Sequence, residues 1–354
     1  MNAAFDDVIG AADADRRDVF LAAARRLGTA VSYIEKDFWV CWTLDAMFNA
    51  AEVRHPRLLF KGGTSLSKSY GLIERFSEDI DITVFRGDLG ADASVEALEA
   101  LSGKQRRARL DAIRDACRTF ITGPFLERLA RTVAATMTRA HVAESRCRIS
   151  VDEDDPDHQT LLFWYPVVTA DAADGYVRSA VKIEAGAKSA LDPHEPTAVA
   201  PYVNGDLPNL DLRVQGITTV DPRRTFWDKV VILHGLRAWF QRRGQLRQGG
   251  QRVSRHYYDV YRLLQAPLGE EALSNLALAA DCARHARMFF GSPDLDLPRA
   301  AAGTFALTPT DAMRPVLERD YEAMAGMIMG ITPDFSDVVR VIAEFERRVN
   351  GRTR

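Results

Sequence analysis

Cysteine is scarce in this chain, which has four among 354 residues, all far from one another. Cys41, Cys117, Cys147 and Cys282 form no C-x-x-C pair. Disulfide frameworks and most cysteine-based zinc sites need paired or regularly spaced cysteines. The pattern therefore favours a protein that keeps its thiols reduced, and we expect a cytoplasmic location.

Long apolar runs are also missing. The first twenty residues are acidic and contain no apolar stretch of the kind found in a signal peptide. No uncharged apolar run approaches the ~18 residues that a membrane span requires. We therefore expect a soluble protein that has no membrane partner.

A large net charge is absent too. Lys and Arg total 46 and Asp and Glu total 49, which gives a net charge of −3. The overall field of such a protein does not attract nucleic acid. Any nucleic-acid partner must therefore be held by a local basic patch.

The order of the predicted elements indicates an α+β protein with a mixed sheet, flanking helices and a helical C-terminal part. We expect a helix over 14–50 and, from Pro222 onward, mostly helices. A proline-rich stretch, 191–212, is interpreted as an extended crossing segment. We predict two domains: a catalytic domain over 1–215, with a basic helical insertion at roughly 90–140, and a helical domain over 216–354 that completes the active-site cleft. We predict strands at the segments RLLF, DIDITVF, RCRISV, TLLFWY and AVKIEAG.

Two aspartates are separated by one residue in the strand-like segment DIDITVF. Side chains alternate across a strand, so Asp79 and Asp81 project from the same face with Cα atoms about 6.5 Å apart. Two carboxylates this close repel each other unless a cation lies between them. Their oxygens are the hard ligands that Mg²⁺ prefers, and Mg²⁺ often shares its coordination sphere with substrate phosphates.

A glycine pair followed by two hydroxyls, Gly62-Gly63-Thr64-Ser65, lies just before the aspartates at a predicted strand-to-helix junction. Free backbone N–H groups and the helix dipole favour an anion there, and glycine allows a phosphate to approach closely. The P-loop signature G-x-x-x-x-G-K-[ST] and the Rossmann fingerprint are both absent. We therefore predict one site in which residues 62–65 bind a triphosphate and the aspartates bind its metal.

This order of elements resembles the nucleotidyltransferase superfamily that includes DNA polymerase β. Within it, KGGTSLSK followed by RFSEDIDI is similar to the AbiEii/AbiGii toxin family, which also contains the MenT-type toxins. The resemblance extends through IEKDFWV (34–40), VKIEAGAKS (181–189), RTFWDK (224–229) and RHYYDVYRLL (255–264). It implies a nucleotidyltransferase fold, Mg²⁺-dependent transfer from an NTP with two ions (Mn²⁺ as a possible substitute), and a toxin role beside a cognate antitoxin.

The resemblance also suggests roles for residues outside the aspartate pair. Glu184 is the candidate third carboxylate and metal ligand, although an edge-strand solvent pair with Lys182 is the alternative. Lys229 is the candidate catalytic lysine that contacts the NTP phosphates; the alternative is a lysine without a role whose stem covers apolar surface. Asp259 is expected to orient Lys229 or a neighbouring basic residue. Arg255 and Lys188 are further candidates for NTP binding.

A basic stretch over 104–118 could bind RNA phosphates independently of sequence. The candidate RNA-binding residues are Lys104, Arg106, Arg107 and Arg109. The loop over 242–255 is a second candidate, and for both the alternative is an ordinary solvated surface. The leading function is transfer of nucleotides to an RNA, at the tRNA 3′ end, which blocks translation. Transfer to a protein or small molecule, and NTP binding without catalysis, stay open as alternatives.

Overall fold

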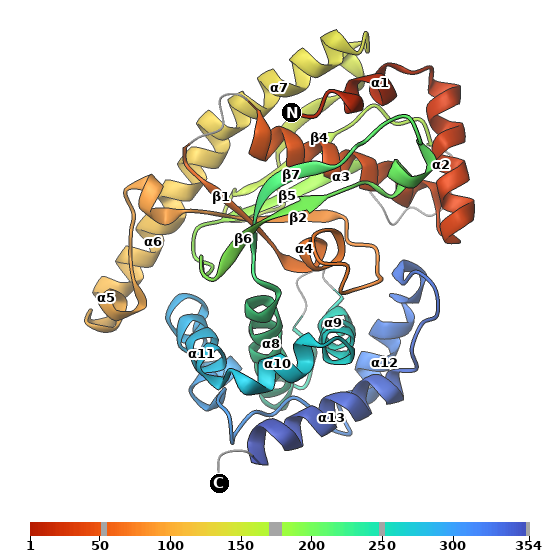
Figure 1. Cartoon of the computed structure of the whole chain (residues 1–354). Helices are drawn as coiled ribbons and strands as arrows, with labels where there is room; N and C mark the ends of the chain where they lie inside the picture. The colour runs from red at the N-terminus through yellow and green to blue at the C-terminus, as the bar shows by residue number, and fades with distance from the viewer. Residues whose placement is uncertain (51–54, 170–178, 248–251, 352–354) are drawn as a thin grey trace. The chain divides into compact units, whose positions relative to one another are not determined.

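The computed structural model describes residues 1–50, 55–169, 179–247 and 252–351 (Figure 1). Its contacts divide the chain into two compact units. The first comprises Met1–Tyr70, Phe76–Ala93 and Gly103–Val220, and the second comprises Gly71–Arg75, Ser94–Ser102 and Asp221–Arg354. Two short segments of the N-terminal half therefore belong to the second unit.

The first unit contains one seven-stranded sheet with the strand order β3-β4-β5-β2-β1-β7-β6. The pairs β2/β5 and β1/β7 are parallel and the remaining neighbours are antiparallel, so the sheet is mixed as predicted. Its strands are β1 (Leu58–Lys61), β2 (Asp79–Val84), β3 (Arg148–Val151), β4 (Thr160–Trp164), β5 (Ala180–Gly186), β6 (His194–Val199) and β7 (Val214–Val220).

Two strands of this sheet were not expected from the sequence. β6 and β7 lie in or just after the proline-rich stretch that was interpreted as a crossing segment. β6 contains Pro196. The proline is tolerated there because β6 is an edge strand, where a missing N–H costs no ladder bond. β7 contains Gly216 with φ +72, which interrupts the alternating pattern by which a strand is recognised.

Helices pack on the sheet of the first unit. The predicted helix over 14–50 is in fact two helices, because Gly28 adopts a left-handed conformation (φ 63) that caps the first of them. The second of the two packs on the sheet through aromatic rings, with Trp39 and Phe163 centroids 5.8 Å apart. The helices are α1 (Ala4–Gly10), α2 (Asp13–Leu27), α3 (Val31–Asn49), α4 (Gly62–Lys68), α6 (Gly103–Phe120) and α7 (Leu126–Arg139).

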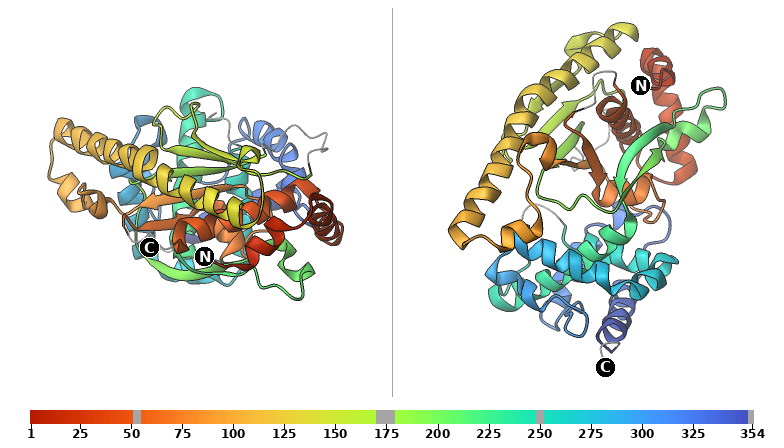
Figure 2. Two further views of the ribbon diagram at one scale, coloured as in Figure 1. Left: turned by 90° about the horizontal axis from the view of Figure 1, so that it is seen from above. Right: turned by 60° about the vertical axis from the view of Figure 1, so that its left-hand side comes forward.

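The predicted basic insertion is helical. α6 continues through a π-helical turn over Ile121–Phe125 into α7, so that together they run as one long helical rod, orange to yellow in Figure 2. The preceding short helix α5 (Val95–Glu99) belongs to the second unit, where Arg284 pairs with Glu96 and Glu99.

The second unit is helical, as the sequence predicted. Its aromatic core includes Trp227 and Phe345, whose ring centroids lie 6.0 Å apart. Besides α5, its helices are α8 (Pro222–Arg243), α9 (Ser254–Gln265), α10 (Leu268–Ser274), α11 (Leu276–Phe290), α12 (Arg314–Glu322) and α13 (Phe335–Gly351). Across the described residues of both units, none of the helices combines the length and the apolar character that crossing a membrane requires.

Candidate active site

Carboxylates gather on one face of the central strand β2 and its neighbour β5. Asp79 and Asp81 alternate along β2 with the fully buried Ile80, as the spacing predicts. The parallel neighbour β5 places Glu184 directly opposite Asp81, and directly opposite residues share a face. The fold thus brings the predicted third carboxylate, Glu184, beside the aspartate pair. Glu184 is not on an edge strand.

The glycine turn and the aspartate strand are in direct contact. Gly62 follows β1, whose last residue, Lys61, pairs with Asp81 in the antiparallel register. Gly62 has φ +84, and a Cβ placed on it would lie 2.1 Å from Oδ2 of Asp81. A side chain at position 62 therefore cannot coexist with this position of the Asp81 carboxylate. The two halves of the segment 60–85 are thus in direct contact.

The two hydroxyls after the glycines are used inside the fold. Thr64 and Ser65 are 1% and 0% exposed. The Thr64 hydroxyl is hydrogen-bonded to the Asp79 carbonyl and, at 2.9 Å, to the Ser77 hydroxyl. The Ser65 hydroxyl donates to the Gly62 carbonyl at 2.9 Å. Thr64 thus ties the start of α4 to β2, and Ser65 bonds within α4. Because both hydroxyls are used in this way, an anion at residues 62–65 would be bound through backbone N–H groups.

The carboxylates perturb one another. Burial raises the pKa of Asp79 to about 7, with further increases from the nearby Glu184, Glu78 and Asp81 carboxylates. Lys36 of α3 opposes this increase. Its ammonium is buried and lies 2.6 Å from the carboxylate of Glu78, the residue just before β2. A carboxyl with a raised pKa beside other carboxylates is stabilised as an anion by a bound cation.

Two lysines contact the carboxylate face. Lys182 lies 2.8 Å from Glu184 and 3.8 Å from Asp152, and Lys61 lies 3.6 Å from Asp81. The oxygen donors on this face suit a hard divalent cation. Nowhere in the described ranges do three or more His, Cys, Asp or Glu side chains converge closely enough to hold a metal. Asp79, Asp81 and Glu184 therefore share a face without forming a closed cage.

Lys188 lies just beyond β5 and is half-buried. The residues on either side of it are held by Arg86, whose guanidinium donates to the carbonyls of Ala187 (3.1 Å) and Ser189 (2.9 Å). Arg86 is itself buried and also donates to Ala93. The backbone around Lys188 is thus fixed by a residue that the sequence did not single out.

Lys229 and Asp259 meet in the second unit. The Lys229 ammonium of α8 lies 2.8 Å from the Asp259 carboxylate of α9, and both residues are buried. The two residues are therefore in contact, as an orienting role for Asp259 requires, and the role itself stays a prediction. Arg255, one turn before Asp259 on α9, is close enough to lower the pKa of Lys229. Arg75 also binds Asp259, with Nε 2.7 Å from Oδ1 and Nη2 2.9 Å from Oδ2. Arg75 is the first residue of the motif RFSEDIDI, but no role was predicted for it, and its partner lies 184 residues away.

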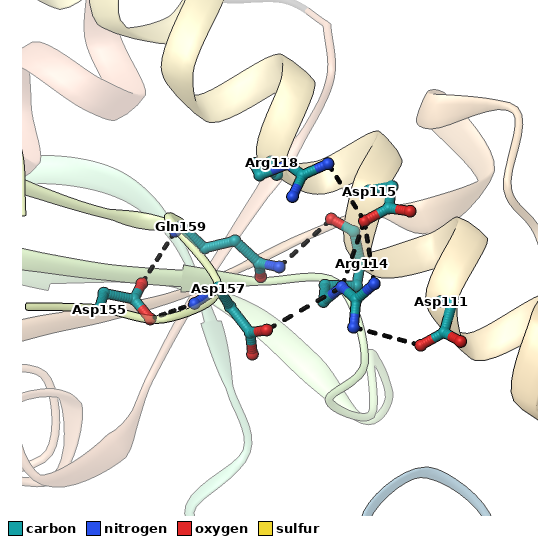
Figure 3. A network of polar contacts seen from close by, with 7 residues as sticks. All are labelled: Asp111, Arg114, Asp115, Arg118, Asp155, Asp157 and Gln159. Carbon is teal, nitrogen blue, oxygen red and sulfur yellow. Dashed lines mark hydrogen bonds and ion pairs between the residues drawn. The ribbon is translucent and has the colours of Figure 1, made fainter. Parts of the chain in front are cut away.

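The basic stretch on α6 divides into two parts. Lys104 and Arg107 are exposed and Arg106 and Arg109 are half-buried, and Arg109 donates to the Asp92 carbonyl. The later basic residues are neutralised by acids, as Figure 3 shows. That network contains Arg114 with Asp111, Asp115 and Asp157, and Arg118 with Asp115. Of the second basic candidate, the loop 242–255, residues 248–251 lie outside the described residues.

Comparisons with known proteins bear on this site. The profile of a family described as "Nucleotidyl transferase AbiEii toxin, Type IV TA system" matches residues 45–344, a range that includes Asp79, Asp81, Glu184, Lys229 and Asp259. No curated protein matches the sequence. Among solved structures, the fold is similar to the nucleotidyltransferase toxin MenT4 from Mycobacterium tuberculosis H37Rv. The TM-score is 0.39 at 16% identity, over 93% of this chain and 97% of that one.

The family match extends over most of the chain, and it confirms the resemblance seen in the sequence motifs. The enzyme class follows from the family: this protein is a nucleotidyltransferase. The chain belongs to the nucleotidyltransferase AbiEii toxin family of type IV toxin–antitoxin systems.

Proposed function

We propose that this toxin transfers a nucleotide from an NTP to an RNA acceptor, the 3′ end of tRNA, and so blocks translation. The observation that supports it best is the carboxylate face on β2 and β5 with Gly62 packed directly against Asp81. A triphosphate and its counter-ion need these two elements within one site. We further propose that the reaction takes place in the cytoplasm and that a cognate antitoxin protein opposes it.

We propose Mg²⁺ as the cofactor, as a pair of ions for which Mn²⁺ can substitute. Asp79, Asp81 and Glu184 supply the oxygen ligands. When bound, such ions stabilise charge on phosphoryl oxygens and lower the pKa of an attacking hydroxyl. The chain's own contribution is to hold the carboxylates on one face, through the parallel register of β2 and β5 and through the ion pairs of Lys61 and Lys182.

The proposed phosphate contacts come from cations and from backbone N–H groups. In the first unit they are the backbone of Gly62, Gly63, Thr64 and Ser65, with Lys188 as a weaker candidate. In the second unit they are Lys229 and Arg255. A lysine is suited to this role because its ammonium is a compact charge that phosphate oxygens can share.

The experiment that tests the function uses the full chain with Mg²⁺, each of the four labelled NTPs, total tRNA and cell lysate. We expect the label to enter tRNA, at its 3′ end, and not protein. Label in a protein or a small molecule instead of RNA would mean that the acceptor is wrong while the transfer chemistry stands. Binding of an NTP with no transfer to any acceptor would favour the non-catalytic alternative.

Gly62→Ala is expected to lower the transfer rate at least tenfold, because the added Cβ displaces the Asp81 carboxylate. It should also cost about 1–2 kcal/mol of stability, since an L-residue with a positive φ is strained. Gly71→Ala is the matched control, because Gly71 also has a positive φ (+62) but no atom within 4 Å of the added Cβ. We expect it to lose similar stability and keep its activity. Equal rates for the two variants would contradict the contact between the turn and Asp81. Urea unfolding and initial transfer rates measure the two effects.

Removing charge from the free end of α6 is expected to weaken RNA binding. Lys104→Gln/Arg107→Gln deletes two exposed cations, and Arg114→Gln/Arg118→Gln deletes two that are paired with acids. If the first pair contacts phosphates, the slope of log affinity against log salt for tRNA should become shallower by about 1.5. The second pair should leave the slope unchanged. NTP binding should stay at the wild-type level in both. Identical slopes for wild type and both variants would make this end of α6 an ordinary solvated surface.

A further inference from the structure

Asp259 is shared by two buried cations in the second unit. Its carboxylate is fully buried. It accepts two hydrogen bonds from the guanidinium of Arg75 and forms an ion pair with the ammonium of Lys229. Arg75 and Lys229 are 3% and 6% exposed. Two positive charges thus face one negative charge, so this three-residue group carries a net charge of about +1 away from water.

Stability alone does not explain such an arrangement. Buried ion pairs contribute little net stability compared with apolar residues of similar volume, because burying each charge is costly. A lysine paired with an aspartate of its own is neutralised and offers little attraction to a third group. When a guanidinium binds the same carboxylate through both oxygens, part of that negative charge is already compensated. Lys229 then keeps positive potential for an anionic ligand.

The charges around Lys229 agree with this geometry. Burial lowers the pKa of Lys229, Asp259 raises it, and Arg75 and Arg255 lower it further. The positive charge of Arg75 is permanent, because a guanidinium does not lose its proton in proteins. The field that Arg75 exerts on Lys229 is therefore constant across the working pH range.

Arg75 is held firmly by the segment to which it belongs. Gly71–Arg75 is part of the second unit. The Glu74 carbonyl accepts from the Met329 N–H at 2.7 Å, the Glu74 carboxylate pairs with Arg262 at 3.1 Å, and Arg75 forms a backbone bridge with Ile328. These contacts hold the backbone from which the Arg75 side chain extends toward Asp259.

We propose that Arg75 is a positioning residue for nucleotide transfer. It holds the Asp259 carboxylate through both oxygens, so that the anion anchoring Lys229 is fixed in place and is partly compensated by the guanidinium, which leaves the ammonium less neutralised toward the NTP phosphates. This inference rests on the proposed role of Lys229. It adds a residue that contacts neither the metal nor the acceptor in the proposed mechanism.

The test is a double-mutant cycle of Arg75→Gln and Lys229→Ala, with NTP affinity measured by calorimetry and KM and kcat measured in the transfer assay. We expect each single variant to weaken NTP binding and raise KM about tenfold, the loss typical of one charged contact. The double variant should bind no more weakly than Lys229→Ala alone, because Arg75 acts through that lysine. Arg75→Lys, which keeps a cation but not the two-point contact, should raise KM by a smaller factor, and it decides the matter if Arg75→Gln does not fold.

Arg348→Gln is the matched control, since Arg348 also binds a carboxylate of the same unit, that of Glu270, through two guanidinium nitrogens. It should leave KM unchanged. The inference is overturned if the Arg75 variants lose stability but keep a wild-type KM. It is also overturned if the increases in KM caused by Arg75→Gln and by Lys229→Ala multiply in the double variant. If Lys229→Ala itself binds NTP as wild type does, the proposed role of Lys229 is wrong and the inference falls with it. If Lys229→Ala loses binding and the Arg75 variants do not, only the inference is wrong.

Discussion

Asp81→Asn is expected to abolish nucleotide transfer, with a loss of about 10³-fold or more in kcat, while the protein stays folded. Asp81 lies between Glu184 on one neighbouring strand and Lys61 on the other, and its carboxylate fills the space beside Gly62. An amide preserves this shape but removes the negative charge that a divalent cation needs. Loss of one such ligand removes several kcal/mol of charge stabilisation in the transition state. Asp79→Asn is expected to behave in the same way.

The control for this experiment is Asp88→Asn, which makes the same chemical change in an ion pair near the other end of β1. Asp88 pairs with Arg57 at 2.9 Å, as Asp81 pairs with Lys61 at 3.6 Å. If the loss in Asp81→Asn came merely from breaking an ion pair between neighbouring segments, Asp88→Asn would lose activity as well. We expect it to transfer nucleotides at the wild-type rate. Near wild-type turnover in purified Asp81→Asn would disprove the metal-ligand assignment.

Asp259→Asn is expected to lower the free energy of unfolding by about 3–5 kcal/mol, because it leaves Arg75 and Lys229 buried without their anion. It should also weaken NTP binding, since Lys229 loses its anchor. The comparison is Asp337→Asn, whose partner Arg340 lies 3.0 Å away and in which both side chains are more than half exposed. Exposed pairs of this kind contribute at most about 1 kcal/mol. Urea unfolding of wild type and the two variants measures how much free energy of unfolding each substitution removes.

The cost of Asp259→Asn should depend on pH in a defined direction. Burial alone would raise the pKa of Asp259, but Arg75 and Lys229 hold it well below its ordinary value of 3.8. A carboxyl with a lowered pKa in the folded state contributes stability above its unfolded pKa and loses it as the pH falls below that value. The difference in free energy of unfolding between wild type and Asp259→Asn should therefore reach its full size at pH 6 and become smaller below about pH 4. A difference that is unchanged at low pH would mean that the carboxylate charge is not its cause.

Several features of the site follow from local sequence alone. Alternation in a strand places Asp79 and Asp81 on one face whatever surrounds them, because successive side chains of a strand point to opposite sides. The helical second unit and the absence of a membrane-spanning run are also local properties, since they depend on periodicity and composition over short windows. The family motifs add the candidate roles of Glu184, Lys229 and Asp259. The contact of the last two agrees with the prediction.

Local sequence was less informative where a strand departs from the usual pattern. β6 was missed because proline argues against a strand, and only its place at the sheet edge makes Pro196 acceptable. Similarly, the basic stretch over 104–118 was predicted as one candidate, although Asp111 and Asp115 lie within it. Folding adds Asp157 beside Arg114, so the cations in the later part of α6 are paired with acids, whereas Lys104 and Arg107 in the first part are exposed.

Composition and periodicity establish which residue types are available and which face of a strand or helix they occupy. Which of these residues meet depends on how distant segments pack in the fold. The register of β5 against β2 places Glu184 opposite Asp81, the backbone of Gly62 leaves room for the Asp81 carboxylate, and Arg75 reaches Asp259 across 184 positions of the chain. These contacts are set by sheet register and packing between distant segments. Periodicity within one segment carries no information about its partner, so such contacts cannot be derived from the sequence of either segment alone.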